Sequence, residues 1–233
     1  MAEKSSLRPY KLKQFKYNSH YWTLKFIRNA NRPLRILDIG TADGYLGAIL
    51  KQQGHYLVGV ERDCSLGQRA REFYDGFHIT DIEAFGFPYK DEFDFILFGD
   101  VLEHLVDPAA VLRRAVGCLN DRGEVIISLP NVANLFIRLM LLFGRWEYSD
   151  RGILDRTHLH FYTLATLKKM IAAASFRVIE VVPTPLAVQL VFPVTDTAIF
   201  APLHELHYLA VRLRKTLLAY QFVVRAVPEP RKW

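Results

Sequence analysis

The chain has 233 residues, of which 51% are hydrophobic and 23% are charged, and this composition excludes a largely disordered protein and suits one folded domain of ordinary size. Its net charge of +6 divides into +8 over residues 1–35, +4 over residues 204–233 and −6 between them. Basic ends indicate an anionic partner such as a phosphate, a lipid surface or RNA, although runs of charge are also common on solvated surfaces.

Three features of the sequence predict a cytoplasmic protein. The two cysteines, Cys64 and Cys118, match neither a disulfide framework nor a zinc pattern, which indicates a reducing compartment. Residues 1–17 are basic and lack the apolar centre of a secretory signal. The most apolar run, residues 132–143, is shorter than the roughly 20 residues that a membrane-spanning helix needs, and it contains Asn134 and Arg138.

Short apolar runs alternate with helical patterns along the chain, and this order predicts a parallel sheet with helices on both faces. The expected strands are LRILDIG (residues 34–40), HYLVGVE (55–61), FHITDI (77–82), FDFILFGD (93–100), EVIISLP (124–130), FRVIEVV (176–182) and LAVQLVF (186–192). The fourth strand is apolar on both faces, as a central parallel strand should be. We therefore expect an α/β fold of the Rossmann-like, doubly wound kind, with a mostly parallel seven-stranded sheet.

Capping residues mark where several helices should begin. Asp63 precedes one helix, Asp107-Pro108 combines a cap with a first-turn proline before another, and Thr163 precedes a third. Residues 120–123, with the sequence Asn-Asp-Arg-Gly, are expected to form a turn before the fifth strand, and Gly144 should end the helix that follows this strand.

The chain is expected to divide into a basic helical extension (residues 1–33), an α/β domain (34–193) and a basic amphipathic extension (194–233). Between Glu205 and Val227 the apolar residues recur with helical spacing, and one face carries Leu206, Leu209, Leu213, Leu217 and Tyr220. Such a helix either lies on a membrane surface, which would make the protein membrane-associated, or packs on its own domain or on the second subunit of a homodimer.

The segment DIGTADGYLG, from Asp38 to Gly47, follows the first expected strand. Ligands of doubly wound sheets bind beyond the carboxyl ends of the strands, so a ligand is expected here first. Gly40 and Gly44 would let the backbone turn sharply and approach a ligand, and Gly47 would let its helix pack on the strand. Position 42 is alanine, so the segment is not a dinucleotide fingerprint, and without a ligand it would be a plain strand-to-helix turn.

An acidic residue, Glu61, ends the second expected strand. An acid about 20 residues beyond a glycine loop can accept hydrogen bonds from both hydroxyls of a ribose. The alternative is a solvated acid at a strand end, and the pairing with the glycine loop favours binding.

Five segments occur in the order found in class I methyltransferases that use S-adenosylmethionine: DIGTADGYLG, VGVERD, Asp81-Ile82, GDVLEHLVDP and GEVIISLPN. Residues 34–182 therefore resemble this family, in particular the branch with the ubiquinone-biosynthesis O-methyltransferases and many sugar and polysaccharide methyltransferases. The resemblance implies S-adenosylmethionine as the methyl donor and S-adenosylhomocysteine as the product.

The resemblance also implies which residues bind the cofactor. Asp38 and the Gly40–Gly44 backbone would hold the methionine portion, Glu61 would bind the ribose hydroxyls, and Asp81 would bond the adenine amino group. Arg62 would pack beside the adenine, Ile82 would cover it, and the segment from Asp100 to Leu102 would line the methionine end. The expected set is Asp38, Gly40, Thr41, Ala42, Gly44, Tyr45, Glu61, Arg62, Asp81, Ile82, Asp100 and Leu102. Many relatives have glycine in place of Ala42, whose small side chain should still permit binding.

His104, in the LEHL segment after the fourth strand, is the first candidate for a catalytic base. A hydroxyl acceptor gains from a general base, whereas the alternative role of this histidine is to bond the backbone or to support the cofactor. Asp100, Glu103 and His104 also resemble a metal-binding cluster in ubiquinone-pathway relatives, and two carboxylates would suit magnesium. We assign no metal from the sequence.

The loop GILDRTHLHFYT, residues 152–163, is similar to segments of relatives from sugar and cell-surface polymer pathways. It carries a second catalytic candidate, His158, and would close over the acceptor. The residues expected to contact the acceptor are Trp146, Tyr148, Asp155, Arg156 and His160. The structural alternatives are an ion pair between Asp155 and Arg156, a His158 that braces a strand, and ordinary aromatic packing.

The sequence thus predicts an O-methyltransferase that acts on a small molecule or a glycan, including a lipid-linked one. The alternative enzyme is a methyltransferase of RNA or protein, which the basic ends favour weakly. The strand end reads Leu129-Pro130-Asn131 where amino-methylases have an Asn-Pro-Pro-Tyr-like tetrad, and we expect no DNA partner. A non-catalytic module that only binds S-adenosylmethionine is the alternative from another class, and the intact loop and Glu61 argue against it.

Overall fold

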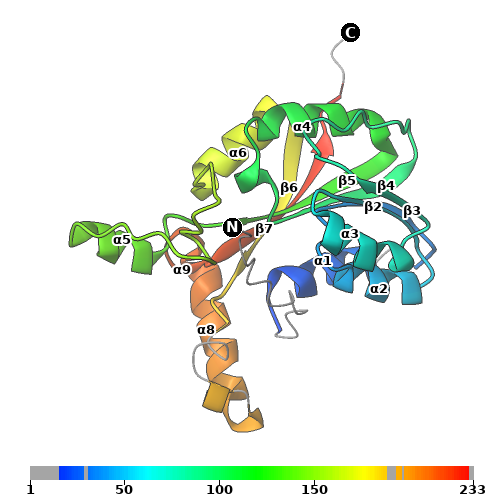
Figure 1. Cartoon of the computed structure of the whole chain (residues 1–233). Helices are drawn as coiled ribbons and strands as arrows, with labels where there is room; N and C mark the ends of the chain where they lie inside the picture. The colour runs from blue at the N-terminus through cyan, green and yellow to red at the C-terminus, as the bar shows by residue number, and fades with distance from the viewer. Residues whose placement is uncertain (1–15, 29–30, 188–192, 196, 231–233) are drawn as a thin grey trace, which may run out of the picture.

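The computed structural model describes residues 16–28, 31–187, 193–195 and 197–230. Its seven-stranded sheet has the order β3-β2-β1-β4-β5-β7-β6. Strands β1 to β5 pair in parallel, and β7 is antiparallel to both β5 and β6 (Figure 1). The bounds are β1 (Arg35–Ile39), β2 (Tyr56–Glu61), β3 (Gly76–Ile79), β4 (Phe93–Gly99), β5 (Leu119–Pro130), β6 (Phe176–Thr184) and β7 (Gln221–Pro228). The mostly parallel Rossmann-like α/β fold expected from the sequence is confirmed.

Helices cover both faces of the sheet (Figure 1). One face is covered by α4 (Pro108–Ala115) and α6 (Leu164–Ala173), and the other by α1 (Ser19–Arg28), α2 (Tyr45–Gln52) and α3 (Cys64–Ala70). Alternate residues of β1 point to the two faces, so that Leu37 belongs to the first cluster of buried side chains and Ile36 to the second. The remaining helices are α5 (Leu135–Leu142), α8 (Ala201–Leu213), α9 (Lys215–Leu218) and the short 3-10 turns η1 (Arg71–Phe73), η2 (Leu102–His104), η3 (Val116–Cys118), η4 (Pro193–Thr195) and η5 (Ala198–Phe200).

The capping residues begin helices where the sequence predicts them. The Asp63 carboxylate accepts the Leu66 N–H at 2.8 Å and so caps α3, and the Asp107 carboxylate accepts the Ala110 N–H at 2.9 Å and caps α4. The Thr163 hydroxyl caps α6 in the same way. After α5, Gly144 takes a positive φ of 69°, which ends that helix as expected.

The tail does not form the single helix expected between Glu205 and Val227. Helix α8 ends at Leu213, and after the short α9 the residues from Gln221 form β7. The side chains from Gln221 to Val224 are all buried between β5 and β6, an environment that an extended strand fills and a surface helix does not. The sheet thus crosses the domain boundary expected between residues 193 and 194.

Two further strand predictions are corrected. The last expected strand, residues 186–192, is not formed at Leu186 and Ala187, and its residues 188–192 lie outside the described part of the chain. The expected turn at residues 120–123 lies within β5, where Leu119 pairs with Phe93 and Glu124 with Phe95. Between these two pairs, Asp94 of β4 lies opposite residues 120–123 of β5. The register therefore shifts here, and this part of β5 is irregular.

Helices α5 and α8 extend away from the sheet (Figure 1). The Asn131 and Asn134 side-chain amides, just before α5, both donate to the Ala219 carbonyl after α9, at 2.9 Å each. These bonds tie the start of α5 to the end of the α8–α9 segment. Among the described residues, no helix is both long and apolar enough to cross a membrane.

Candidate active site

The loop between β1 and α2 has a backbone that small residues adopt most easily. Gly40, Ala42 and Gly44 have positive φ angles of 77°, 50° and 82°. A Cβ atom on Gly40 would lie 2.4 Å from a methyl carbon of Val101, and one on Gly44 would lie 2.8 Å from the Cα atom of Ala70. The left-handed conformation costs an alanine roughly 1–2 kcal/mol, which explains why glycine suits position 42.

Glu61, the last residue of β2, faces this loop. Its Oε2 accepts the N–H of Ala42 at 2.9 Å, and its Oε1 accepts the N–H of Asp63 at 2.8 Å. The carboxylate therefore ties the loop after β1 to the end of the neighbouring strand. Each carboxylate oxygen has a second lone pair, so these two bonds leave acceptor capacity for ligand hydroxyls.

Asp38 lies at the carboxyl end of β1 and is only 4% exposed. The Tyr74 hydroxyl donates a hydrogen bond of 2.6 Å to its Oδ2. Burial raises the pKa of Asp38 to about 6, the bond from Tyr74 lowers it, and the nearby charge of Glu61 raises it. Sequence reasoning gave no sign of the Tyr74 contact, because the two residues are 36 positions apart.

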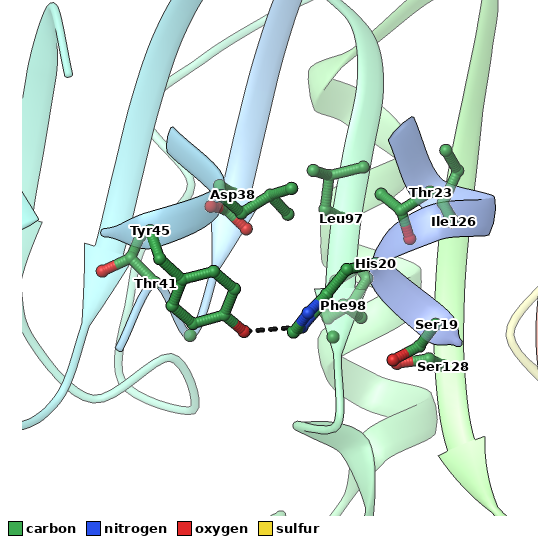
Figure 2. A pocket seen from close by; sticks show the side chains of 13 residues that line it. Ser19, His20, Thr23, Asp38, Thr41, Tyr45, Leu97, Phe98, Ile126 and Ser128 are labelled. Atoms are coloured by element: carbon green, nitrogen blue, oxygen red, sulfur yellow. Dashed lines mark hydrogen bonds between the residues drawn. The ribbon is translucent and has the colours of Figure 1, made fainter. Parts of the chain in front are cut away.

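A pocket opens beside Asp38 at the carboxyl ends of β1, β4 and β5 (Figure 2). Ser19, His20 and Thr23 of α1 form one wall, and the Tyr45 hydroxyl is 2.7 Å from Nε2 of His20. The other lining residues are Asp38, Gly40, Thr41, Tyr45, Leu46, Leu97, Phe98, Gly99, Ile126 and Ser128. Of the expected loop residues, Asp38, Gly40, Thr41 and Tyr45 line this pocket, whereas Ala42 and Gly44 do not. Helix α1 contributes three side chains that the sequence did not single out.

Helix α1 is held over the pocket by contacts with α8. The ring of Tyr17, just before α1, stacks on Tyr208 with centroids 3.8 Å apart. The Tyr17 hydroxyl donates to Glu205 at 2.5 Å, and the Lys16 amino group forms an ion pair with the same carboxylate at 2.6 Å. The first described residues thus contact α8 next to the α1 residues that line the pocket.

Asp81 and Arg62 lie just beyond the ends of β3 and β2, respectively. Both side chains are exposed, and the Asp81 carboxylate accepts the Glu83 N–H at 2.8 Å. Ile82 is buried and packs in the core with Phe85. The acids of β1, β2 and the β3 loop are therefore arranged along one edge of the sheet, in the order of the strands.

Neither Asp100 nor Leu102, the two residues after β4 that were expected at the cofactor, is among the residues that line the pocket. Asp100 has a positive φ of 57°, and its Oδ1 accepts from the Ser128 hydroxyl at 2.7 Å and from the Gln221 amide. Leu102 is fully buried in the core, so its side chain packs there. The β4 residues that line the pocket are Leu97, Phe98 and Gly99.

Glu103, His104 and His158 come together next to this edge. The first two lie in η2, and the loop of residues 152–163 brings His158 beside them, with the two imidazole centroids 4.8 Å apart. The Nε2 atom of His158 lies 4.0 Å from Glu103 Oε1. The backbone N–H groups of Leu159 and His160 donate to the Glu103 carbonyl at 2.8 and 3.1 Å, which fixes the loop against η2.

The two histidines are oriented by different groups. Nδ1 of His158 lies 3.2 Å from the Ile153 carbonyl, which only accepts, so this nitrogen carries the hydrogen. Nδ1 of His104 contacts the Thr157 hydroxyl at 3.1 Å. Burial lowers the pKa of His158 and the neighbouring His104 lowers it further, so His158 is neutral near pH 7 and has a lone pair on Nε2.

The same three side chains are the candidate metal ligands. Each offers one ligand atom, and these atoms lie within 4.8 Å of one another. One carboxylate and two imidazoles suit zinc or iron better than magnesium, which prefers oxygen ligands. Asp100, which the sequence groups with Glu103 and His104 as a candidate metal-binding cluster, is not among these three residues.

The other residues expected to contact the acceptor have varied partners. Asp155 accepts from the Thr157 hydroxyl at 2.6 Å and shapes the loop, while Arg156 pairs with Asp150 at 2.8 Å and not with Asp155. His160 borders the same small cleft as His158. The rings of Trp146 and Tyr148 pack edge to face with centroids 6.3 Å apart, and Tyr148 is exposed.

Comparison with known proteins identifies the family of the chain. The family profile described as "Methyltransferase domain" matches residues 14–181. A ubiquinone biosynthesis O-methyltransferase of Aeromonas salmonicida is 32% identical over 152 residues, which are 62% of this chain and 63% of that protein, less than two thirds of its length. A tRNA 5-carboxymethoxyuridine methyltransferase of Escherichia coli is 24% identical over 52% of this chain and 49% of its own.

A solved structure supports the fold over nearly the whole chain. The magnesium protoporphyrin IX methyltransferase of Synechocystis, solved with bound S-adenosylhomocysteine, superposes with a TM-score of 0.59. It is 15% identical, and the match covers 91% of this chain and 82% of that one. The profile, the relatives and the fold lead to one conclusion, that the chain belongs to the family of class I methyltransferase domains that use S-adenosylmethionine.

Proposed function

We propose that the protein transfers a methyl group from S-adenosylmethionine to an oxygen atom of a small molecule or a glycan. The observation that carries this proposal is the position of Glu103, His104 and His158 just beyond β4, the strand whose last residues line the pocket beside Asp38. An imidazole that takes up a proton is useful for a hydroxyl acceptor, and the relative in Aeromonas salmonicida is named as an O-methyltransferase.

The residues at the pocket edge fit the cofactor by their chemistry. A buried carboxylate, Asp38, would face the amino group of the methionine portion, and Glu61 would accept the ribose hydroxyls. Asp81 and Arg62 would flank the adenine, and the Gly40–Gly44 backbone would follow the ligand closely. Tyr74 donates to Oδ2 of Asp38, and a cationic ligand group at the pocket wall would further offset the cost of burying this carboxylate.

When bound, S-adenosylmethionine supplies an electrophilic methyl group. The residues of the chain would position the acceptor and manage its proton. His104 would receive the hydroxyl proton at Nε2, because Thr157 engages its Nδ1. The Glu103 carboxylate, which has an oxygen within 4.8 Å of a ring nitrogen of His104, would then stabilise the positive imidazolium, and His158 and His160 would border the acceptor in the adjoining cleft.

Titration calorimetry with S-adenosylmethionine tests the cofactor half of this proposal. We expect one binding site per chain with a dissociation constant well below the millimolar range, because the pocket offers charge and backbone donors together. A chain that shows no heat of binding at millimolar cofactor would contradict the proposal and favour a different use of the fold.

A methyl-transfer assay with labelled cofactor tests the acceptor half. Cell extract is divided into lipid, glycan, RNA and protein fractions, and label is expected in a small-molecule, glycan or lipid-linked glycan fraction. Label in RNA alone would replace the proposal with the alternative that the Escherichia coli relative represents. Turnover that chelators abolish and zinc or iron restores would show that Glu103, His104 and His158 hold a metal.

We further propose peripheral contact of α8 with an anionic membrane. Leu206 and Leu213 are 61% and 75% exposed. Arg212 lies in the last turn of the same helix, and Arg214 and Lys215 follow directly after it. Exposed leucines beside basic side chains are typical of helices that lie in the plane of a membrane surface. Helix α5, the other helix that extends away from the sheet, also has exposed apolar side chains, such as Phe136 at 66%. A lipid-linked acceptor would be reached from such a position.

Sedimentation with anionic vesicles tests this contact. The double variant Leu206→Glu, Leu213→Glu is expected to bind vesicles at least roughly tenfold more weakly, because it removes apolar burial and adds negative charge. Ile179→Glu, a matched change on the partly exposed β6, should bind like the unaltered protein. Equal binding of all three proteins would exclude α8 from the contact, and a concentration-dependent dimer lost in the double variant would assign the face to a second copy.

A further inference from the structure

Tyr74, the hydrogen-bond partner of Asp38, is not among the residues given a role above. Asp38 faces the pocket between Tyr45 and Leu97 (Figure 2). Its Oδ2 accepts the hydrogen bond of 2.6 Å from Tyr74, which does not line the pocket. Tyr74 itself is buried, with 8% of its surface exposed. A buried hydroxyl that donates to a buried carboxylate at the wall of a ligand pocket is well placed to control that carboxylate.

Gly47 makes room for this contact. A Cβ atom at position 47 would lie 2.4 to 2.6 Å from three atoms of the Tyr74 ring, including the hydroxyl oxygen at 2.5 Å. Gly47 lies within helix α2 and its φ is not positive, so the glycine is required by the neighbouring ring and not by the backbone. The glycine expected from the sequence to let its helix pack on the strand therefore admits Tyr74.

We propose that Tyr74 is a positioning residue, which holds the Asp38 carboxylate in the orientation and charge state that receive the amino group of the cofactor's methionine portion. This inference rests on the proposed binding of S-adenosylmethionine. Its physical basis is that Tyr74 acts through Asp38 and does not itself line the pocket.

The groups around Asp38 explain why its charge needs support. Burial raises the pKa of Asp38 to about 6, the Tyr74 hydroxyl lowers it, and Glu61 on β2 raises it. Burial and the Asp38 charge raise the pKa of Tyr74 well above 10, so the hydroxyl remains a donor at neutral pH. The other titratable side chains that face this pocket are Tyr45 on α2 and His20 on α1, which bond to each other.

Without the Tyr74 hydroxyl, the two causes that raise the Asp38 pKa remain and the one that lowers it is lost. The carboxylate then takes up a proton at a higher pH. Attraction of a cationic amino group is present above the pKa of Asp38 and is lost as the pH falls through it, by roughly tenfold for each pH unit below it. The binding of S-adenosylmethionine by Tyr74→Phe should therefore weaken at a higher pH than that of the unaltered protein.

Calorimetry at several pH values between about 5.5 and about 8.5 measures this shift, because this range includes and extends above the Asp38 pKa of about 6. We expect the ratio of the two dissociation constants to be near one at the alkaline end and to rise to roughly tenfold for each unit of pKa shift at the acidic end. The ratio at each pH cancels the titration of the cofactor's own amino group. Tyr89→Phe, which removes another partly buried hydroxyl that contacts His78, should give a ratio of one throughout.

Carbon NMR of the Asp38 carboxyl group, without cofactor, gives a second measurement. Tyr74→Phe should raise its titration midpoint, and Gly47→Ala should do the same because the added methyl displaces the Tyr74 ring. An unchanged midpoint in both variants overturns the proposal, and so does a loss of affinity that is equal at every pH, which would mark a merely structural tyrosine. The midpoint could rise in Tyr74→Phe although the protein binds no S-adenosylmethionine at any pH. That result would contradict the proposed function but would still show that Tyr74 lowers the pKa of Asp38.

Discussion

Replacing His104 by asparagine is expected to lower the methylation rate about 10²- to 10⁴-fold, the usual contribution of a general base. The asparagine amide can replace the His104 Nδ1 atom in its contact with Thr157, so the loop should keep its place, but an amide takes up no proton at neutral pH. The affinity for S-adenosylmethionine should be unchanged, because His104 does not line the cofactor pocket. Initial rates and calorimetry on the same preparation measure the two effects separately.

The pH dependence of the rate distinguishes a base from a bystander. A catalytic base contributes its own part of the pH–rate profile, so the profiles of the unaltered protein and of the asparagine variant should differ in shape and not only in height. His204→Asn is a matched control, since that imidazole also contacts a loop residue, the Thr195 carbonyl, but lies on α8. Full turnover of the His104 variant, together with a slow His158→Asn variant, would exchange the roles of the two histidines.

Replacing Glu61 by alanine should weaken S-adenosylmethionine binding about 10- to 100-fold. Hydrogen bonds to a charged group contribute about 1.5–3 kcal/mol, which corresponds to that range of affinity. The carboxylate would bind the ribose and also holds the N–H of Ala42 at 2.9 Å, so its loss removes ligand contacts and loosens the glycine loop at the same time. Calorimetry gives the change directly.

Two further variants separate these contributions. Glu61→Gln keeps one acceptor oxygen and should lose less affinity than Glu61→Ala. Glu92→Ala removes the same charge at the opposite edge of the sheet, where Glu92 pairs with Arg35 at 2.6 Å, and should bind as the unaltered protein does. Unchanged affinity in Glu61→Ala would remove this residue from the binding site.

Local signals in the sequence predict much of the fold. The apolar run of β4 and the caps Asp63, Asp107 and Thr163 each depend on residues within a few positions of one another, and the structure has the expected element at each place. The cofactor loop is likewise a local pattern, and its positive φ angles fall at Gly40, Ala42 and Gly44.

Contacts between distant segments are not predicted from such signals. Tyr74 contacts Asp38 in a space that Gly47 of α2 leaves free. His20 lines the pocket because α1 packs on the sheet beside it. Strand β7 was mistaken for the end of a helix because the apolar spacing of α8 continues through Leu217 and Tyr220. Residues 221–228 form a strand because they lie between β5 and β6, and this position exists only in the folded sheet.

The place of β7 in the sheet has a consequence for the order of events during synthesis. Strands β5 and β6 are adjacent only through β7, which is made last among the seven strands. Until β7 is made, the nascent chain therefore holds an incomplete sheet whose β5 edge has no partner, and β6 has no strand to pair with. Open edges of this kind attract other chains, and pairing of distant segments is slow, so the emerging chain would depend on chaperones until its final strand inserts.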